Sequence, residues 1–496
     1  METAQHTTSA AKSAWLDESN WRDAIFNGRW ERVGQPTDVF SPATGEAIGR
    51  IALVGAAEVS RSAATARDAQ RAWHQLDFEQ RARILRKAAD LAEAHLPELA
   101  DWIVRESGSV RAKAEFEMGI TIRSLREAAA MPSQPQGLVL PGSSDRISLC
   151  RRLPLGVIGV IAPFNFPLYL AMRAVAPALA VGNAVVLKPD PRTTISGGVV
   201  IAQLLAEAGL PEGVLHVLPG GGDAGAALCS DPNIAMIAFT GSTAAGRKVG
   251  ELAGRHLKKV SLELGGKNSL IVLDDADMDL AVSNAAWGAY LHQGQICMAT
   301  GRILVQRGIA EEFTRRLAEK ASNLPVGDPS TNQVALGPLI NRTQIAHAQD
   351  IVDRSVSAGA KLEAGGTHEG LFFKATVLSG VCPGMPAFEE EVFGPVAPIT
   401  TFETDEEAIT LANQTEYGLS AGVISRSVSR AFSLGNRLRT GLLHINDQTV
   451  ADDVVNPFGG VGASGNGTSI GGPANWEEFT QWQWVTVRGT AQAYPF

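Results

Sequence analysis

The chain has 496 residues, of which 45% are hydrophobic and 19% charged; this composition is typical of a folded protein, and the length predicts two or three substructures. The formal charge of −9 reflects 52 acidic and 43 basic residues, and without any run of lysine or arginine the sequence argues against nucleic acid as a partner. The sequence shows neither a signal-peptide core near its start nor an uninterrupted span of roughly 18–20 apolar residues, so we expect a cytoplasmic protein that does not enter the membrane.

Helices and short strands alternate along the first half of the chain. Two amphipathic helical stretches are predicted over 56–76 and 78–108, with Gly108 as the C-cap of the second. Further helices are predicted over 168–182, kinked at Pro177, and over 194–213 and 243–257. The apolar strands between them are expected within 151–161, 183–189, 214–221 and 234–242. This alternation is typical of βαβ crossovers and a parallel sheet.

The alternation continues after Lys267 and predicts a second α/β unit. Strands are expected over 268–273 and 302–306, and helices over 279–294 and 310–324. Near the C-terminus, residues 481–490 alternate in the manner of a strand without an accompanying helix. That strand either adds to the sheet of a neighbouring subunit or forms a terminal edge strand within its own domain.

Cys297 and Glu263 are the two residues whose surroundings favour catalysis. The four cysteines, at 150, 229, 297 and 382, form no CxxC pair and favour reduced thiols over disulfides or a metal site. Cys297 lies between Gly294 and Gly301, where backbone N–H groups can support a thiolate nucleophile; the alternative is a small buried core residue. Glu263 ends an apolar strand that would raise its pKa and suit it as a base; the alternative is an ion pair at a strand end.

Two further segments have the pattern of a phosphate and ribose site. Residues 239–246, FTGSTAAG, read as strand, Gly–Ser turn and helix, which directs N–H groups toward an anion. Lys188 in LKPDP ends a predicted strand, where open α/β sheets bind ligands. Each signal is weak alone, because a single glycine turn is not the GxGxxG fingerprint.

Together these segments resemble the NAD(P)-dependent aldehyde dehydrogenase superfamily, across residues 27–484. The resemblance is carried in the family order by APFNFP, GNAVVLKP, FTGSTAAG, LELGGKN, GQICMA, EEEVFGPV and NPFGGVGASGNG. It implies two parallel-sheet α/β domains, a Rossmann-like cofactor domain and a catalytic domain, with a small oligomerisation sheet. We expect the cofactor domain over 1–135 and 154–261, the catalytic domain over 262–474, and the oligomerisation segment over 136–153 and 475–496. A homodimer or homotetramer follows from the resemblance.

The resemblance also assigns roles at the reacting centre. Cys297 would attack the aldehyde carbon, and the Asn165 side-chain amide with the Cys297 N–H would form the oxyanion hole. Glu263 would activate the water that hydrolyses the thioester. No metal is implied.

For the cofactor, Lys188 would hold the adenosine ribose, Gly241 and Ser242 the pyrophosphate, and Glu391 the nicotinamide ribose with Phe393 packed beside it. Many NAD-preferring relatives have a glutamate where this sequence has Pro191. We therefore expect NAD as cofactor, with NADP tolerated.

The substrate motifs look most like those of the benzaldehyde and vanillin dehydrogenase branch. The expected lining of the aldehyde tunnel is Phe166, Tyr169, Leu170, Arg173, Ile296 and Phe458. The aromatic residues either stack on an aryl ring or form a general tunnel lining, and Arg173 either contacts a ring substituent or pairs with a structural acid. The alternatives to an aromatic aldehyde are an aliphatic aldehyde or semialdehyde, a CoA-acylating enzyme, a non-redox cysteine hydrolase and a non-catalytic protein that keeps the fold.

Overall fold

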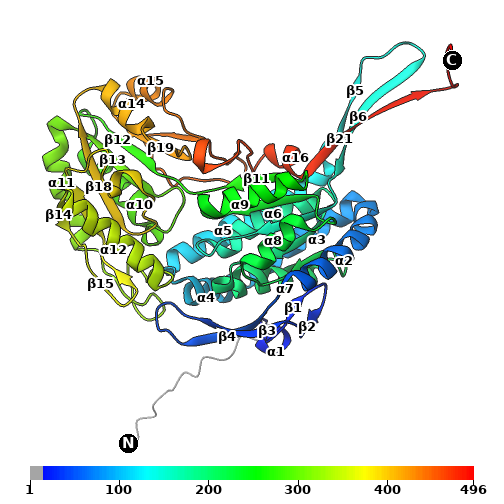
Figure 1. Ribbon diagram of the computed structural model, residues 1–496, viewed down its shortest axis with the longest axis horizontal. Coiled ribbons are helices and arrows are strands. Elements are labelled where there is room, and N and C mark those ends of the chain that lie inside the picture. The colour runs from blue at the N-terminus through cyan, green and yellow to red at the C-terminus, as the bar shows by residue number, and fades with distance from the viewer. Residues whose placement is uncertain (1–14) are drawn as a thin grey trace, which may run out of the picture.

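The computed structural model describes residues 15–496 (Figure 1). Residues 1–14, which begin the predicted cofactor domain, lie outside the described residues. Two seven-stranded, mainly parallel sheets and a projecting three-stranded antiparallel sheet form the fold. The predicted α/β class is therefore confirmed. No helix within 15–496 is both long and apolar enough to cross a membrane.

The first sheet has the order β11-β10-β7-β8-β9-β1-β2. Its five parallel strands are β7 (Val157–Ile161), β8 (Ala184–Lys188), β9 (Leu215–Val217), β10 (Met236–Thr240) and β11 (Lys259–Glu263). The short strands β1 (Ile25–Phe26) and β2 (Trp30–Glu31) extend it in the antiparallel sense. The chain adds β8 and β9 on one side of β7 and then β10 and β11 on the other. Strand order therefore reverses at β7, the kind of point where open α/β sheets bind ligands beyond the carboxyl ends of their strands.

The helices of this half bury apolar side chains against the sheet or against one another. They are α2 (Ala56–Gln75), α3 (Phe78–Ala94), α4 (Leu96–Ser107), α5 (Arg111–Ala130), α6 (Pro167–Ala180), α7 (Val200–Ala208), α8 (Gly222–Ser230) and α9 (Thr243–Arg255). Gly108 closes α4 with φ 70°, as predicted. The predicted stretch 78–108 is instead two helices, because the backbone turns at His95 and Pro97 stands in the first turn of α4, where its missing N–H is tolerated.

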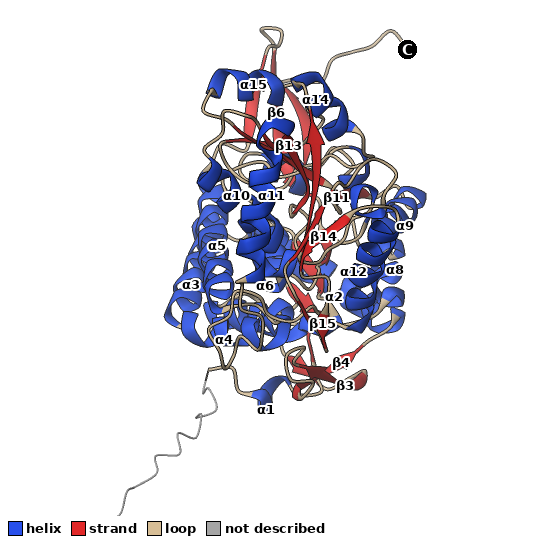
Figure 2. Cartoon of the chain, turned by 90° about the vertical axis from the view of Figure 1, so that its left-hand side faces the viewer, coloured by secondary structure: helices blue, strands red, loops and turns tan. Residues whose placement is uncertain are grey.

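The second sheet has the order β14-β17-β18-β13-β12-β19-β20. Its strands are β12 (Asn268–Val272), β13 (Thr300–Gln306), β14 (Lys361–Ala364), β17 (Thr376–Ser379), β18 (Val396–Phe402), β19 (Ser420–Ile424) and β20 (Leu442–Ile445). Successive residues of β12 enter different apolar clusters: Leu270 packs with α10 (Met278–Tyr290) and α11 (Arg307–Ser322), and Ile271 with α12 (Arg342–Ser357). Helices therefore cover both faces of the sheet, as the turned view shows (Figure 2).

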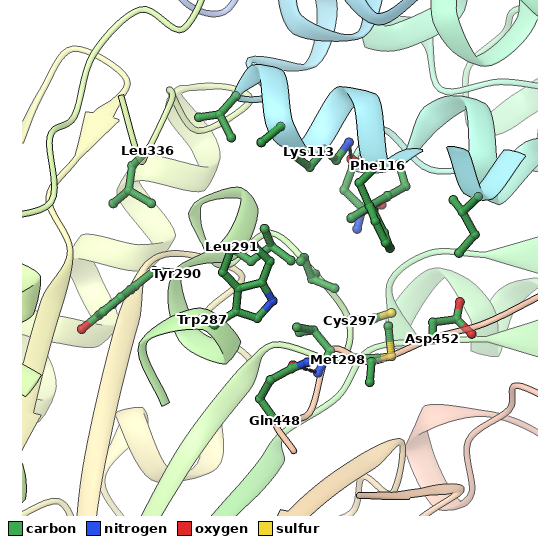
Figure 3. A pocket seen from close by; sticks show the side chains of 18 of the residues that line it. Lys113, Phe116, Trp287, Tyr290, Leu291, Cys297, Met298, Leu336, Gln448 and Asp452 are labelled. Carbon is green, nitrogen blue, oxygen red and sulfur yellow. Dashed lines mark hydrogen bonds between the residues drawn. The ribbon is translucent and has the colours of Figure 1, made fainter. Parts of the chain in front are cut away.

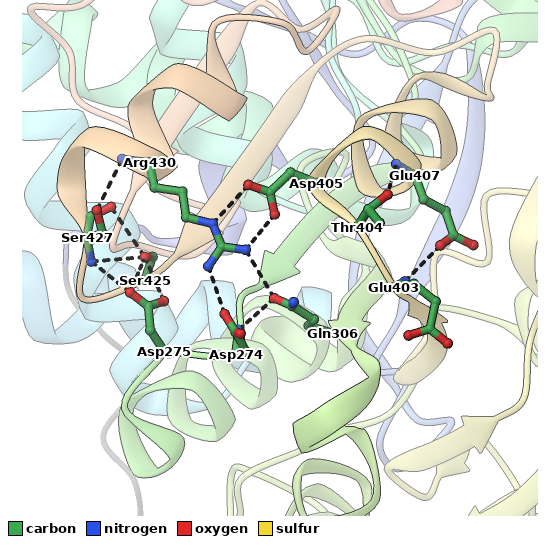
Figure 4. A network of polar contacts seen from close by, with 10 residues as sticks. All are labelled: Asp274, Asp275, Gln306, Glu403, Thr404, Asp405, Glu407, Ser425, Ser427 and Arg430. Atoms are coloured by element: carbon green, nitrogen blue, oxygen red, sulfur yellow. Dashed lines mark hydrogen bonds and ion pairs between the residues drawn. The ribbon is translucent and has the colours of Figure 1, made fainter.

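An ionic network occupies the carboxyl edge of the second sheet (Figure 4). Arg430 donates hydrogen bonds to Asp274 after β12 (2.7 Å) and to Asp405 after β18 (2.5 and 2.9 Å). Asp275 accepts from the Ser425 hydroxyl after β19 (2.8 Å). These contacts join the segments that follow β12, β18 and β19 to one another, so the polar groups at this edge serve the fold. The opposite edge, where β12 and β13 begin at Asn268 and Thr300, is the one near Cys297.

The third sheet projects from the body of the molecule (Figure 1). It contains β5 (Gly137–Leu140), β6 (Arg146–Pro154) and β21 (Thr480–Arg488). The predicted terminal strand is present as β21, and it pairs antiparallel with β6 along its whole length. β21 therefore pairs with a strand of its own chain, which is the second of the two arrangements predicted for it.

Candidate active site

A cavity of about 820 Å³ brings together residues from distant parts of the chain (Figure 3). Cys297 and Asn165 both line it. The six side chains predicted for an aldehyde tunnel line it as well: Phe166, Tyr169, Leu170, Arg173, Ile296 and Phe458. These eight residues share one cavity although they come from separate parts of the chain: α6 and the loop before it, the segment around Cys297, and the loop at Phe458.

Cys297 lies between α10 and β13, after a short segment with unusual backbone geometry. His292, Gln293 and Gly294 all have positive φ, which turns the chain sharply before the cysteine. The Cys297 carbonyl accepts a hydrogen bond from the Asn268 side-chain amide at 2.8 Å. Burial, assisted by nearby Glu391, raises the pKa of the Cys297 thiol to about 12. The thiol is thus protonated at neutral pH, and a nucleophilic attack requires a base to take its proton.

Glu263 ends β11 and is buried without hydrogen-bond partners. Neither of its carboxylate oxygens accepts a hydrogen bond within the described chain. Burial raises the pKa of this carboxyl well above its ordinary value, and the charge of Arg173 opposes the rise. Glu263 lines a separate small cavity of about 10 Å³ together with Thr240, Arg173 and Ile470. A space of that size holds about one water molecule, which suits a carboxylate that activates water.

The predicted oxyanion residue Asn165 is buried at the end of the loop after β7. Its amide nitrogen donates to the Gln295 carbonyl at 2.8 Å, close in sequence to Cys297. Its own main-chain carbonyl accepts from Lys113 Nζ at 2.7 Å. Lys113 therefore holds the Asn165 main chain, while the Asn165 side chain is bonded to the segment that carries Cys297.

Lys113 and Glu117 form an ion pair that the sequence analysis missed. Both side chains are fully buried, and Nζ lies 2.5 Å from Glu117 Oε2. The ammonium also lies 4.0 Å from the centre of the Phe166 ring. Glu117 Oε1 accepts from the N–H groups of Leu168 (2.9 Å) and Tyr169 (3.1 Å) in the first turn of α6. The pair thereby connects α5 to the loop that carries Asn165 and Phe166.

Arg173 pairs with an acid, which is one of the two roles that the sequence predicted for it, and it also lines the cavity. Its guanidinium lies 3.6 Å from Asp452 and 3.8 Å from the centre of the Phe458 ring. Asp452 also accepts from the Tyr169 hydroxyl at 3.1 Å. Asp452 had no motif to mark it in the sequence. It fixes the orientation of two of the predicted tunnel residues.

The predicted cofactor residues lie at the carboxyl ends of the first sheet, outside the large cavity. Lys188 ends β8 and donates to the Gly220 carbonyl at 2.9 Å. Gly241 follows β10, and Ser242 caps α9 by accepting from the Ala245 N–H at 3.3 Å. Lys188 therefore lies on one side of β7, and Gly241 and Ser242 lie on the other, at the point where strand order reverses.

Glu391 and Phe393 come from the second half of the chain to the same region. Glu391 Oε1 accepts from the Gly266 N–H at 2.9 Å, and burial raises the pKa of this carboxyl to about 7. Phe393 has φ 51° and packs edge-on against Phe164. An ammonium, a capped helix start and a carboxylate are groups suited to a ribose, a pyrophosphate and a second ribose, so these residues fit a dinucleotide.

Comparison with known proteins identifies the family. Residues 30–485 match the model of the aldehyde dehydrogenase family. The chain belongs to this family. A vanillin dehydrogenase of an Amycolatopsis species is 55% identical to this aldehyde dehydrogenase over 97% of this chain and 100% of its own length. A benzaldehyde dehydrogenase (NAD+) of Pseudomonas putida is 49% identical over 96% of this chain and 98% of its own length.

A solved structure agrees with this family membership. The salicylaldehyde dehydrogenase from Pseudomonas putida G7, complexed with salicylaldehyde, matches with a TM-score of 0.92 at 35% identity, over 95% of this chain and 99% of that one. The predicted aldehyde dehydrogenase fold is thus confirmed. The roles of individual residues in this aldehyde dehydrogenase stay predictions.

Proposed function

We propose that this protein oxidises an aromatic aldehyde to the carboxylic acid with NAD+, and that it tolerates NADP+. The observation that carries the proposal is the single cavity in which Cys297 and Asn165 share the wall with Phe166, Tyr169 and Phe458. Aromatic rings around a nucleophile favour an aryl aldehyde, because ring–ring contacts add to simple burial. The similarity to vanillin and benzaldehyde dehydrogenases supports the same substrate class.

The residues support covalent catalysis in two halves. In the first half the Cys297 sulfur bonds to the aldehyde carbon, while its proton passes to Glu263 or to a water beside it. The negative charge that develops on the aldehyde oxygen is stabilised by the Asn165 amide and the Cys297 N–H. NAD+ held by Lys188, Ser242 and Glu391 would supply the oxidant, as the acceptor of a hydride from the carbon attached to sulfur. The cysteine is then left as a thioester.

In the second half Glu263 removes a proton from a water, and the water oxygen bonds to the thioester carbon. The carbon–sulfur bond breaks, the thiol regains a proton, and the acid leaves. Neither carboxylate oxygen of Glu263 has a hydrogen-bond partner within residues 15–496, so both can accept from that water. A CoA-acylating enzyme would not need this hydrolytic base.

The cofactor preference depends on the segment after Lys188. Arg192 donates to Asp190 through two hydrogen bonds, of 2.8 and 2.7 Å, and its guanidinium lies 4.3 Å from the Phe164 ring centre. Its charge is therefore already paired and adds little attraction for a 2′-phosphate. No carboxylate at Pro191 repels that phosphate either. NAD+ is the expected cofactor, with NADP+ accepted at a lower rate.

A homodimer or homotetramer is part of this proposal. The projecting sheet exposes apolar side chains, among them Val139 and Trp484, that a second copy of the chain would cover. Sedimentation analysis of the purified protein tests this, because a monomer at micromolar concentration would contradict it.

The experiment for the activity is the absorbance of NAD(P)H with benzaldehyde, vanillin and hexanal, each with NAD+ and with NADP+. We expect both aryl aldehydes to give higher kcat/KM than hexanal, and NAD+ to exceed NADP+. A preference for hexanal would replace the aromatic assignment by an aliphatic one. Hydrolysis of an ester without NAD(P)H formation from any of the three aldehydes would indicate a non-redox hydrolase. No turnover of any kind would exclude all three aldehydes.

A further inference from the structure

The large cavity exceeds the space that one aromatic aldehyde fills. Its volume is about 820 Å³. A cavity of about 150 Å³ accommodates a benzene ring, so a single-ring aldehyde at Cys297 would leave most of the space free. The free part extends away from Cys297 toward Trp287, Tyr290 and Leu336 (Figure 3).

The two ends of the cavity belong to different parts of the apolar core. Around Cys297 the wall is formed by a cluster that contains Ile296, Met298 and Phe458. The far wall comes from the cluster between the second sheet and the helices α10 and α11. We call this far part the outer subsite, and its lining residues are Ala286, Trp287, Tyr290, Leu324 and Leu336.

One face of α10 forms much of the outer subsite. Ser283, Ala286, Trp287 and Tyr290 all line the cavity, and their spacing of three and four residues places them on the same side of the helix. The wall is rigid, because Tyr290 is buried and its hydroxyl donates to the Thr376 carbonyl at 3.1 Å. The outer subsite is therefore built on a fixed helix face.

Two aromatic side chains of the cavity have no aromatic or cationic partner within the described chain. Trp287 on α10 is 55% exposed, and Phe116 on α5 is 49% exposed. Both line the cavity, together with the polar side chains of Gln448 and Lys320. Large rings left uncovered beside a cavity are typical of a binding surface, and a flat aromatic group is the ligand that their faces and edges favour.

From the volume, the continuous apolar wall and these unpaired rings we infer that the outer subsite binds a second aromatic ring of the substrate. The substrate class would then be aryl aldehydes whose ring carries another ring through a short linker. The reacting ring lies near Phe166 and Phe458, and the second ring lies against Trp287. This inference rests on the proposed function and specifies its substrate further.

The test compares kcat/KM for 4-phenoxybenzaldehyde and benzaldehyde. Burial of the second ring should make the two-ring aldehyde better by about tenfold or more. Trp287→Ala should reduce that ratio to about twofold or less. Leu280→Ala is the matched control, because Leu280 is on the same helix, is 62% exposed and does not line the cavity. It should leave the ratio unchanged.

A binding measurement separates failure of this inference from failure of the proposed function. The ketones 4-phenoxyacetophenone and acetophenone cannot be oxidised as aldehydes, so their affinities can be measured by tryptophan fluorescence without turnover. Tighter binding of the two-ring ketone, lost in Trp287→Ala, would support the outer subsite even if neither aldehyde reacts. Equal kcat/KM for the two aldehydes, equal affinity for the ketones, or a preference retained in Trp287→Ala would overturn the inference.

Discussion

The Lys113 ammonium donates a hydrogen bond to the main-chain carbonyl of Asn165, at 2.7 Å. The same ammonium is paired with Glu117 and lies against the face of the Phe166 ring. The buried ammonium therefore has three partners: a carbonyl, a carboxylate and an aromatic ring. Burial lowers the pKa of Lys113, and the nearby carboxylate of Glu117 opposes that fall. Lys113 is thus a positioning residue for the loop that carries the predicted oxyanion donor.

Replacement of Lys113 should therefore affect turnover more than binding. Lys113→Met should lower kcat by about tenfold or more, because a small displacement of Asn165 weakens its contact in the transition state. KM should change little. Steady-state kinetics measure both, and the release of p-nitrophenolate from p-nitrophenyl acetate reports acylation of Cys297 without any cofactor.

The double variant Lys113→Met/Glu117→Gln is the control for stability. It should regain most of the thermal stability that Lys113→Met loses, because no charge is left buried without a partner, while kcat stays low. Full recovery of kcat in the double variant would show that Lys113 serves only the stability of the fold.

The nucleophile assignment predicts a loss of activity without a loss of cofactor binding. Cys297→Ala should lower the dehydrogenase rate by at least about a thousandfold. The change in intrinsic fluorescence on addition of NAD+ should persist, since Lys188, Ser242 and Glu391 are untouched. A variant that keeps appreciable turnover would mean that another residue is the nucleophile.

Glu263→Gln should stop the reaction at the thioester. With a saturating aryl aldehyde and NAD+, intact mass spectrometry should detect the acyl adduct on the protein, while the first turnover still releases NADH. In the unmodified protein, the deacylation rate should rise with pH through the raised pKa of Glu263, because only its ionised form accepts a proton. A normal steady-state rate without an adduct would assign the base to another group.

The same substitution should change the pH dependence of stability. The folded-state pKa of Glu263 lies above its ordinary value, so the native protein binds an extra proton between the two values. Stability from this group is present at low pH and is lost as pH rises through the folded pKa. Glu263→Gln should therefore raise Tm by about 1 °C or more at pH 8.5 and by less at pH 5. An equal shift at both pH values would contradict a buried, protonated Glu263.

Arg173 should set the position of the pH–rate profile. Its charge lowers the pKa of both Glu263 and Cys297, against the effect of burial. In Arg173→Met/Asp452→Asn, which leaves no unpaired buried charge at this pair, the acidic limb of kcat/KM should move to higher pH, because Arg173 lowers the pKa of Glu263 more than Asp452 raises it. Asp452→Asn alone should leave the limb near its original position or move it lower. An unmoved limb in the double variant would limit Arg173 to packing.

The sequence predicted the alternation of helices and strands well, because short β-branched runs and amphipathic stretches are local signals. It failed where a tertiary contact overrides the local pattern. Residues 195–199 form a π-helical turn before α7 where a regular helix was predicted. Gly198 lies there so close to Val217 that a Cβ atom would come within 2.8 Å of its side chain. The local sequence does not indicate that Gly198 and Val217 lie so close together.

The same distinction applies to the site. Cys297, Glu263 and Asn165 stand in glycine- or proline-rich segments with a characteristic order, so they could be proposed before any coordinates. Lys113 and Glu117 are spaced like any solvated ion pair on a helix, and only the fold reveals that both are buried. Trp287 similarly reads as one apolar residue of a helix. Its exposure beside the cavity depends on how α10 is oriented.

The pairing of β6 with β21 has a consequence for the order of folding during synthesis. Ser148 on β6 and Trp484 on β21 are hydrogen-bonded although 336 residues separate them. At about 5–20 residues per second, β6 and β5 leave the ribosome about 15–70 s before their third strand exists. Through that interval the nascent hairpin presents an unpaired edge to other chains on the same messenger RNA, until β21 is made and covers it.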